Sequence, residues 1–244
     1  MHQNKIFDFI AGETIPVNKP YRWTSFDVVN KIRYSIKQDL GIPKIRIGHA
    51  GTLDPLATGL LIICTGKHTK QIESLQSLEK EYSGLIRLGA TTPSFDLETE
   101  IDRVFPFEHI GRDDLEKAAI QLSGEIMQVP PVFSAIKVKG RRAFDYARNE
   151  ESLQIKARMV HIKKFQITSF EPPYVGFSIV CSKGTYIRSL ARDLGIMLES
   201  GAHLSLLRRD RIGDFTSDNA YELDDLLAIL INSQQIYPDS SSGS

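Results

Sequence analysis

Residues 48–64 read GHAGTLDPLATGLLIIC, and the rest of the chain is organised around this stretch. Its first part, residues 48–59, contains too much Gly and Pro for the interior of a helix or strand, so it predicts an ordered loop. The apolar run at residues 60–64 predicts a buried strand. Asp54 therefore lies on a tight loop beside a core strand. It is either a catalytic carboxylate or a turn residue, because Asp-Pro is common in turns.

The composition is that of an ordinary soluble globular protein, with 41% hydrophobic and 25% charged residues. The length of 244 residues allows one large domain or two small ones. No apolar run reaches the roughly 20 residues that cross a bilayer, and the N-terminus lacks a signal-peptide pattern. Cys64 and Cys181 both lie in apolar runs, which favours reduced core thiols. We therefore expect a cytoplasmic protein.

Charge is unevenly distributed along the chain, although the net charge is zero. Residues 18–70 carry 9 Lys or Arg against 3 Asp or Glu, and residues 130–211 carry 15 against 7. Residues 71–129 carry 5 Lys or Arg against 12 Asp or Glu, and residues 212–244 carry no Lys or Arg. If the basic blocks meet in space, they form a surface for a polyanion; otherwise they are solvated faces.

Hydrophobic periodicity and turn signals predict a mixture of helices and strands. A first helix is capped by Thr24 or Ser25, and its apolar stripe comprises Phe26, Val29, Ile32 and Ile36. We expect further helices at about 113–122 and 221–231, and further strands at 80–90, 158–170, 174–182 and 204–211. The order lacks strict βαβ alternation. It favours an α+β fold with a mixed or antiparallel central sheet flanked by helices and loops.

Two segments suggest an anionic partner. Residues 127–150 interleave Lys and Arg with aromatic side chains, which suits an RNA backbone with unstacked bases. The same pattern also fits core aromatics with solvent-facing lysines. Arg188 lies near the predicted start of a helix, against the preference of the helix dipole, and this placement hints at a specific anionic partner.

The patterns of several common chemistries are absent from the sequence. The six histidines show no pairing at metal-ligand spacing and the two cysteines are isolated, so we expect no metal site. The Gly66-Lys67 pair lacks the rest of a phosphate-binding loop, and there is no GxGxxG fingerprint or GxSxG elbow. We therefore expect no nucleotide-triphosphate site. A single carboxylate, Asp54, remains as the candidate nucleophile or base, and an adjacent arginine would keep it ionised.

Several segments together resemble the TruB family of bacterial tRNA pseudouridine synthases. Residues 48–59 resemble the signature of that family. Four more segments match in the same order, namely the strand of Tyr82, Gln128 to Tyr146, Gly184 to Arg188, and Leu207 to Arg209. The resemblance covers roughly residues 12–215. Five ordered segments are far more specific than an isolated LDP tripeptide.

The resemblance implies the pseudouridine synthase fold and the isomerisation of the T-arm uridine at position 55 of tRNA to pseudouridine, without a cofactor. Asp54 would be the catalytic aspartate, and Arg188 would pair with it. Tyr82 would stack on the flipped target base, because an extruded base needs a flat apolar partner.

Four more residues receive supporting roles from the resemblance. His49 would stack in the space that the flipped nucleotide leaves, and Leu207 would pack beside the base. Lys19 and Tyr186 would support the pocket. Without the resemblance, Tyr82 and Leu207 would fit core positions and His49 would be an ordinary loop histidine.

The resemblance also sets expectations for domains and partners. We expect a single catalytic domain over residues 1–235, an RNA-gripping insertion at about 127–150, and a disordered tail at 236–244. Many relatives continue into a PUA domain, for which about 30 residues after Phe215 are too few. The chain would act on tRNA as a monomer, without guide RNA or membrane. The alternative is an RNA-binding or tRNA-folding module in which chemistry is secondary.

Overall fold

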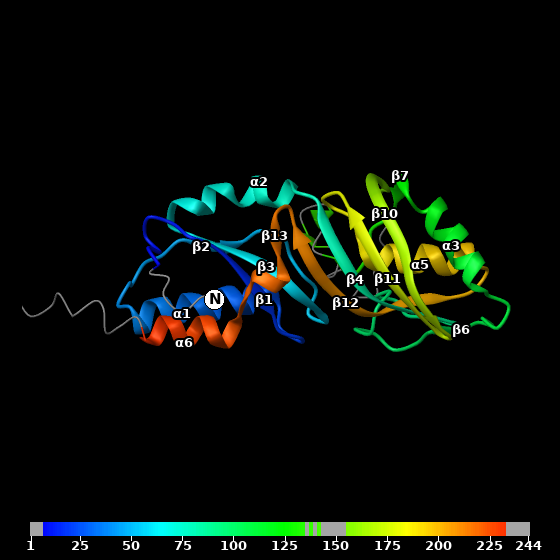
Figure 1. Ribbon diagram of the computed structural model, residues 1–244, viewed down its shortest axis with the longest axis horizontal. Coiled ribbons are helices and arrows are strands. Elements are labelled where there is room, and N and C mark those ends of the chain that lie inside the picture. Colours follow the sequence, from blue (N-terminus) through cyan, green and yellow to red (C-terminus); the bar gives the residue numbers. More distant parts are fainter. Residues whose placement is uncertain (1–6, 135–136, 139–140, 143–154, 233–244) are drawn as a thin grey trace, which may run out of the picture. The chain divides into compact units, whose positions relative to one another are not determined.

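The computed structural model describes residues 7–134, 137–138, 141–142 and 155–232. The chain forms two compact units, one of Met1–Leu78 with Arg209–Ser244 and one of Glu79–Arg208. We call them unit 1 and unit 2. Figure 1 labels the elements of both. Each unit has its own strands and its own covering helices.

Unit 1 contains a small mixed sheet. Its strands are β1 (Thr14–Lys19), β2 (Ile47–His49), β3 (Ala57–Thr65), β13 (Phe215–Thr216) and β14 (Tyr221–Glu222). Strand β1 runs antiparallel to β3, with Val17 opposite Leu61, and parallel to β14. Strand β2 pairs with the end of β3, with Gly48 opposite Cys64. The loop that carries Asp54 therefore connects two adjacent antiparallel strands.

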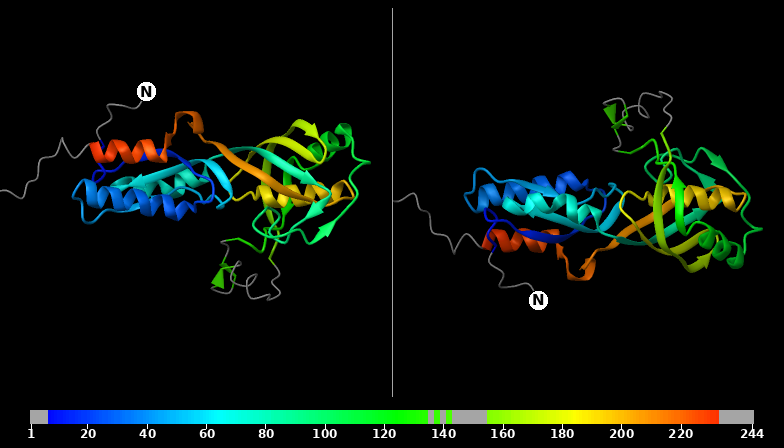
Figure 2. Two further views of the ribbon diagram at one scale, coloured as in Figure 1. Left: turned by 90° about the horizontal axis from the view of Figure 1, so that it is seen from below. Right: turned by 90° about the horizontal axis from the view of Figure 1, so that it is seen from above.

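Helices cover both faces of the unit 1 sheet. They are α1 (Ser25–Asp39), α2 (Ile72–Ser77) and α6 (Leu223–Asn232), with 3-10 turns at Gly66–Gln71 and Ser217–Asn219. Leu61 and Ile63 of β3 pack in the core formed with α1 and α6, which lie side by side (Figure 2). Leu60 and Ile62 pack in a second core, against which residues of α2 lie. This alternation explains why the run at 60–64 is apolar throughout.

Helix α1 begins as the sequence predicted. Thr24 is the N-cap, and its hydroxyl accepts a hydrogen bond from the Asp27 backbone N–H while Asp27 bonds back to the Thr24 N–H. One residue of the predicted apolar stripe is wrong, because Phe26 is 60% exposed. The buried stripe includes Ser25 and Val28 instead, so the apolar face is rotated by about one residue from the prediction.

Unit 2 is built on antiparallel strands in the order β12-β4-β11-β10-β7. These strands are β4 (Lys80–Leu88), β7 (Gly124–Gln128), β10 (Arg158–Glu171), β11 (Tyr174–Cys181) and β12 (Ala202–Ile212), the last of which runs into unit 1. Two short pairs accompany them, β5 (Ala90–Thr91) with β6 (Arg103–Val104) and β8 (Lys137–Val138) with β9 (Arg141–Arg142). The strands predicted at 158–170 and 174–182 are present as β10 and β11, which form an antiparallel hairpin with Glu171 opposite Tyr174.

The helices of unit 2 are α3 (Arg112–Gln121) and α5 (Ile187–Met197). Helix α3 contacts both β10 and α5. Helix α5 begins at Ile187 with Tyr186 as its N-cap, so Arg188 lies at the start of a helix, as the sequence predicted. With helices on a mixed sheet in unit 1 and on antiparallel strands in unit 2, the predicted α+β class is confirmed.

Both cysteines are free and buried, as predicted. Cys64 lies on β3 and Cys181 ends β11. Burial raises the pKa of the Cys64 thiol, which keeps it protonated and unreactive. Among the residues that the structure describes, no helix is both long enough and apolar enough to span a bilayer.

Candidate active site

Asp54 lies on a loop whose backbone is hydrogen-bonded at both ends. The Ala50 N–H donates to the Ile62 carbonyl over 2.8 Å, and the Ala57 N–H donates to the Asp54 carbonyl over 3.1 Å. Gly51 has a φ of +97°, a backbone conformation that side chains rarely adopt. The loop is therefore a defined structure rather than a loose connection, and Asp54 is half-buried on it.

Lys19 binds the loop from one side. Its side chain is 1% exposed, and its ammonium donates to the carbonyls of Pro20 at 2.9 Å, Trp23 at 2.6 Å and Pro55 at 3.2 Å. Burial lowers the pKa of Lys19 to about 8, although the nearby Asp54 carboxylate acts in the opposite direction. A buried ammonium thus lies close enough to Asp54 to favour its ionised form.

Arg209 binds the loop at other points. It is 1% exposed, and its guanidinium donates to the carbonyls of Leu60 at 2.8 Å, Gly51 at 3.0 Å and Thr52 at 3.4 Å. The sequence prediction included this arginine in the family-matching segment Leu207 to Arg209 and assigned it no role. The sequence did indicate that Arg209 is buried. Side chains two positions apart on a strand lie on the same face, so Arg209 shares the inward face of Leu207. An arginine on a buried face requires partners, and here they are loop carbonyls.

A serine at the start of α1 completes the support of the loop. The Ser25 hydroxyl accepts a 2.8 Å hydrogen bond from the Leu53 N–H and lies 3.1 Å from the Leu53 carbonyl, to which it donates. Ser25 is 2% exposed and Leu53 is 4% exposed, so water does not compete for these bonds. The residue immediately before Asp54 is therefore held on both of its backbone groups.

His49 ends β2 and is half-buried. Burial lowers the pKa of His49, the positive charge of Arg209 lowers it further, and a hydrogen bond with the Gly51 backbone acts in the opposite direction. The ring is therefore neutral near pH 7, since even an unperturbed imidazole is mostly neutral there. A neutral, flat ring at this position suits stacking better than it suits binding to a phosphate.

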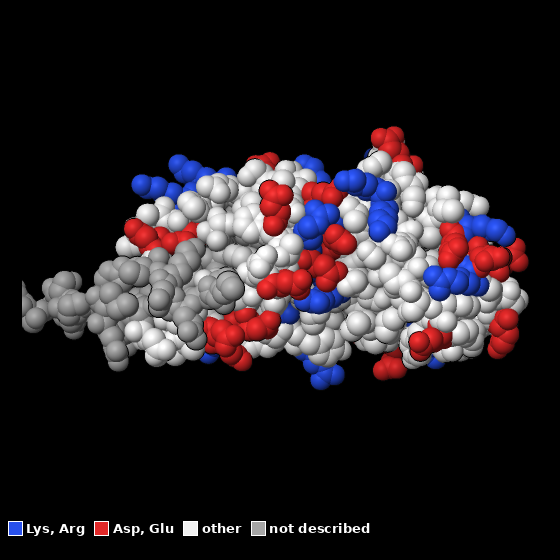
Figure 3. Space-filling view, viewed as in Figure 1, with Lys and Arg blue, Asp and Glu red and all other residues white. Residues whose placement is uncertain are grey.

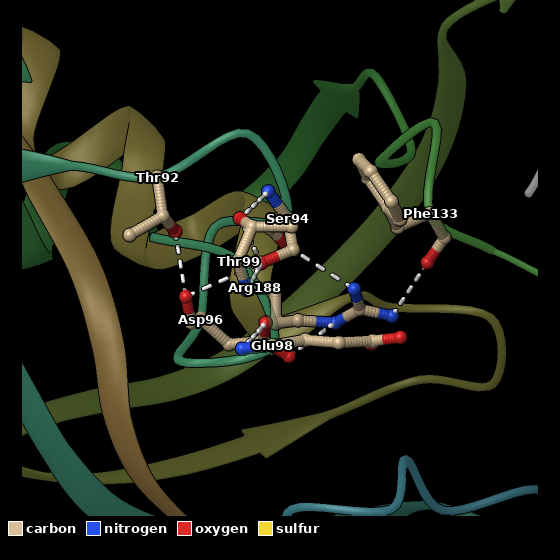
Figure 4. A network of polar contacts seen from close by, with 7 residues as sticks. All are labelled: Thr92, Ser94, Asp96, Glu98, Thr99, Phe133 and Arg188. Carbon is tan, nitrogen blue, oxygen red and sulfur yellow. Dashed lines mark hydrogen bonds and ion pairs between the residues drawn. The ribbon is translucent and has the colours of Figure 1, made fainter. Parts of the chain in front are cut away.

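Arg188 is the centre of a polar network in unit 2 (Figure 4). It is 3% exposed, and its guanidinium donates to the carbonyls of Ser94 at 3.1 Å and Phe133 at 2.9 Å. Its Nε lies 3.6 Å from Asp96 Oδ2, an ion pair between two buried side chains. The sequence prediction did not include Asp96, because this residue lies in an acidic, loop-like stretch with no motif around it.

The loop that presents Asp96 is bonded to itself. Thr92 Oγ1 donates to the Asp96 carbonyl over 2.6 Å, and Asp96 Oδ1 accepts from the Glu98 N–H over 3.0 Å (Figure 4). Phe95 has a φ of +63°, and the Arg192 guanidinium lies 4.9 Å from the centre of its ring. A non-glycine residue in the left-handed region is strained, and such strain is common at functional sites.

Tyr82 and Leu207 come from adjacent strands of unit 2, β4 and β12. Tyr82 is 8% exposed and Leu207 is 7% exposed. Gly84, two residues beyond Tyr82, lies directly against the Leu206 carbonyl, so a side chain there would clash. Both side chains are thus held on a closely packed sheet. Ile86 and Leu88 lie on the same face of β4 as Tyr82, and all three are buried.

The backbone of Tyr186 is held to β7 by two hydrogen bonds with the side-chain amide of one glutamine. Its N–H donates to Gln128 Oε1 over 2.8 Å, and its carbonyl accepts from Gln128 Nε2 over 3.1 Å. The Arg158 guanidinium lies 4.8 Å from the centre of the Tyr186 ring. This fully buried glutamine, which the site prediction omitted, orients the residue that caps helix α5.

The predicted site residues are divided between the two units. Asp54, His49 and Lys19 share one loop region in unit 1. Tyr82, Leu207, Arg188 and Tyr186 belong to unit 2. The pairing of Arg188 with Asp54 stays a prediction, as do the roles of all seven residues. Asp96 is one carboxylate that lies beside Arg188 in the structure.

The described residues show no feature of a metal centre, since no three His, Cys, Asp or Glu side chains among them could hold an ion together. On the face that Figure 3 shows, acidic and basic side chains lie interspersed rather than gathered into one basic patch. Much of the predicted insertion at 127–150 lies outside the described residues.

Comparisons with known proteins agree over most of the chain. The model of the TruB family pseudouridylate synthase N-terminal domain matches residues 37–187, and that of the tRNA pseudouridylate synthase B C-terminal domain matches residues 188–240. The tRNA pseudouridine synthase B of Parabacteroides distasonis is 52% identical over 90% of this chain and 95% of its own length. The protein of that name from Phocaeicola vulgatus is 56% identical over 85% of this chain and 88% of its own length.

Solved structures are similar too. One is a Cbf5-Nop10-Gar1 complex, with a TM-score of 0.69 and 28% identity over 90% of this chain. Another is an H/ACA RNP bound to a substrate RNA containing 2'-deoxyuridine, with a TM-score of 0.67 and 25% identity over 95% of this chain. The present chain spans only 54% and 57% of those two chains.

Proposed function

Since the chain belongs to the TruB family of pseudouridylate synthases, we propose that it isomerises the uridine at position 55, in the T arm of tRNA, to pseudouridine. The membership confirms the predicted family and the predicted enzyme class, an isomerase that forms pseudouridine in tRNA. The choice of the T arm rests on the resemblance of residues 48–59 to the family signature.

The observation that carries the proposal is the way in which Asp54 is held. Lys19, Arg209 and Ser25 together bond seven backbone carbonyls of the loop, the turn beside it and the start of β3. A carboxylate on such a support is positioned before the substrate arrives, so little reorganisation is needed during the reaction. A loop aspartate with only a turn-forming role would not need two buried cations.

The reaction is an isomerisation that conserves all atoms. The bond from N1 of the base to C1′ of the ribose breaks, and a bond from C5 to C1′ forms. A proton leaves C5 and another is gained at N1, so no oxidant and no cofactor is required. We assign to Asp54 the role of the reacting carboxylate and to Tyr82 the stacking partner of the flipped base.

The remaining residues support these two. Arg188 stabilises negative charge in the site, and Leu207 packs beside the base. His49, neutral near pH 7, stacks where the target nucleotide has left the helix. Lys19 holds the Asp54 loop, and Tyr186 shapes the pocket with Gln128. Each of these roles rests on the family resemblance, together with the burial described above.

We also propose the organisation in which this chain works. It is a cytoplasmic monomer with one catalytic domain over residues 1–235 and an RNA-gripping insertion at about 127–150. It acts on tRNA without a guide RNA. One of the solved structures named above is a complex of Cbf5 with Nop10 and Gar1, and nothing in this proposal requires such partners for the present chain.

Substituting Asp54→Asn tests the proposal. The amide keeps the size of the side chain but cannot act as a base or nucleophile, so we expect the rate of pseudouridine formation to fall by at least roughly 10³-fold. The assay maps pseudouridine in unmodified tRNA under single-turnover conditions. An Asp54→Asn enzyme with near wild-type activity, or a wild-type product at a position other than 55, would contradict the proposal.

Two controls separate chemistry from binding. Asp214→Asn changes an exposed aspartate of the same unit, and we expect normal activity from it. Binding of tRNA by Asp54→Asn should stay within about twofold of wild type, because basic groups supply most of the affinity. A wild-type protein that binds tRNA but forms no pseudouridine would instead favour the tRNA-folding alternative.

A further inference from the structure

The turn at residues 20–23 contains an unusual arginine. The Trp23 N–H lies 3.4 Å from the Pro20 carbonyl to which it donates, so Tyr21 and Arg22 are the two central residues of the turn. Arg22 has a φ of +67°. The second central residue of a type II turn needs a positive φ, and glycine or asparagine usually occupies it. An arginine there costs backbone energy that a glycine would avoid.

This turn is attached directly to the Asp54 loop. The Arg22 N–H donates to the Pro55 carbonyl over 2.9 Å. The Lys19 ammonium bonds three carbonyls at once, those of Pro20, Trp23 and Pro55. The turn and the loop are therefore held by the same buried ammonium, and the turn has a defined position beside Asp54.

The side chains at the tip of the turn face solvent. Tyr21 is 48% exposed and Arg22 is also exposed. The guanidinium of Arg22 lies 5.5 Å from the centre of the Tyr21 ring, a cation–π distance that orients the cation without neutralising it. Among the described residues, no ion pair involves Arg22. The positive φ of Arg22 costs backbone energy that folding does not require, and its exposed cation stands on a turn attached to the Asp54 loop, which points to a ligand.

We propose that Arg22 binds a phosphate of the RNA substrate next to the target nucleotide, and that Tyr21 holds the guanidinium in place. This inference rests on the proposed function, because the anion is the backbone of the RNA whose base reacts at Asp54. Arginine suits this task because its planar fork can donate two hydrogen bonds to phosphate oxygens. Contacts of this kind fix the register of a nucleic acid without reading its sequence.

The first test compares Arg22→Gly with wild type in binding and in stability. Glycine accepts the positive φ, so we expect a midpoint of thermal unfolding that is equal to or higher than that of wild type. Affinity for a T-arm stem-loop RNA should fall by about fivefold to tenfold at low salt, and the slope of log Kd against log salt should decrease by about one. Stability and binding thus change in opposite directions, which a merely structural role could not produce.

Three further variants control this comparison. Arg22→Asn, which also tolerates a positive φ, should weaken binding as much as Arg22→Gly does. Arg22→Lys keeps the charge and should retain the salt slope. Lys37→Gln removes an exposed cation from the last turn of α1 and should leave affinity within about twofold of wild type.

The second test removes the phosphate charge instead of the arginine. Stem-loop RNAs with one neutral methylphosphonate linkage at each position around the target would be bound to wild type and to Arg22→Gly. We expect one linkage beside the target nucleotide at which a neutral group lowers the RNA affinity of wild type but leaves the affinity of Arg22→Gly unchanged. The inference would be overturned if every neutral linkage lowered RNA affinity equally in both proteins and if Arg22→Gly had the same slope of log Kd against log salt as wild type. If the wild-type protein binds the RNA but forms no pseudouridine, the proposed function is contradicted and the inference about Arg22 is not. The comparison of the two proteins and the two kinds of RNA measures only affinity.

Discussion

Units 1 and 2 each contain buried cations, but they hold them in different ways. In unit 1, Lys19 and Arg209 donate their hydrogen bonds to backbone carbonyls around Asp54. In unit 2, Arg188 lies beside a carboxylate, Asp96, in addition to two carbonyls. All three side chains are at most 3% exposed, so the difference lies in their partners rather than in their burial.

The partners decide what each cation can do. A carbonyl has no net charge, so these bonds fix the backbone and leave the positive charge of Lys19 and Arg209 free to act on neighbouring groups. The lowered pKa values of Lys19 and His49 both include such effects of Arg209. Beside Arg188, the Asp96 carboxylate compensates much of the positive charge. The ion pair therefore stabilises the loop of Asp96 and produces little positive potential around it. Unit 1 therefore holds the reacting loop in a positive environment, and unit 2 holds a balanced network.

The largest expected effect comes from Arg209→Met. The substitution leaves three carbonyls without their donors, that of the buried Leu60 among them, and removes a buried charge, so we expect the free energy of unfolding to fall by about 3–5 kcal/mol. Urea denaturation measures this change. Arg208→Met is the matched control, because Arg208 is the exposed neighbour on the same strand and its loss should change stability by less than about 0.5 kcal/mol. Equal losses in the two variants would mean that Arg209 does not support the loop.

A smaller effect is expected from Asp96→Asn. The amide can still accept from the Glu98 N–H, and Arg188 keeps its two carbonyl partners, so only the charge compensation is lost. We expect the free energy of unfolding to fall by roughly 1.5–3 kcal/mol. The decisive measurement is a double-mutant cycle with Arg188→Met. In the Arg188→Met protein, Asp96→Asn should lower the free energy of unfolding clearly less than it does in wild type. Purely additive effects would show that the contact at 3.6 Å contributes no coupling.

The smallest effect concerns Lys19 and pH. Its pKa is about 8 in the folded protein and 10.5 for an ordinary lysine, so between these values the unfolded chain binds more protons. The free energy of unfolding then rises with pH. We expect the difference between wild type and Lys19→Met to increase by about 1 kcal/mol from pH 8 to pH 9, and to be constant below pH 7. Urea denaturation across this range measures it. If the stability difference between wild type and Lys19→Met stayed constant or fell as the pH rises, the lowered pKa of Lys19 would be contradicted.

Much of the fold was predictable because its signals are local. The strands β10 and β11 show as alternating runs separated by two prolines, and helix α1 shows as a capping box followed by a 3.6-residue period. The error at Phe26 arose because the stripe of an amphipathic helix was placed from apolar residues alone. Ser25 is buried in place of Phe26 because its hydroxyl bonds to Leu53, a partner that is distant in sequence.

By itself the sequence determined the class of the fold, the loop that carries Asp54, the family and the reaction type, since each follows from short local patterns and from the order of those patterns along the chain. Only the tertiary structure decided which residues support that loop and which group accompanies Arg188. Arg209 lies 158 positions from Gly51, and Arg188 lies 94 from Ser94, so no local pattern links them. A buried cation must find acceptors wherever the fold brings them, and this requirement pairs residues by space rather than by sequence.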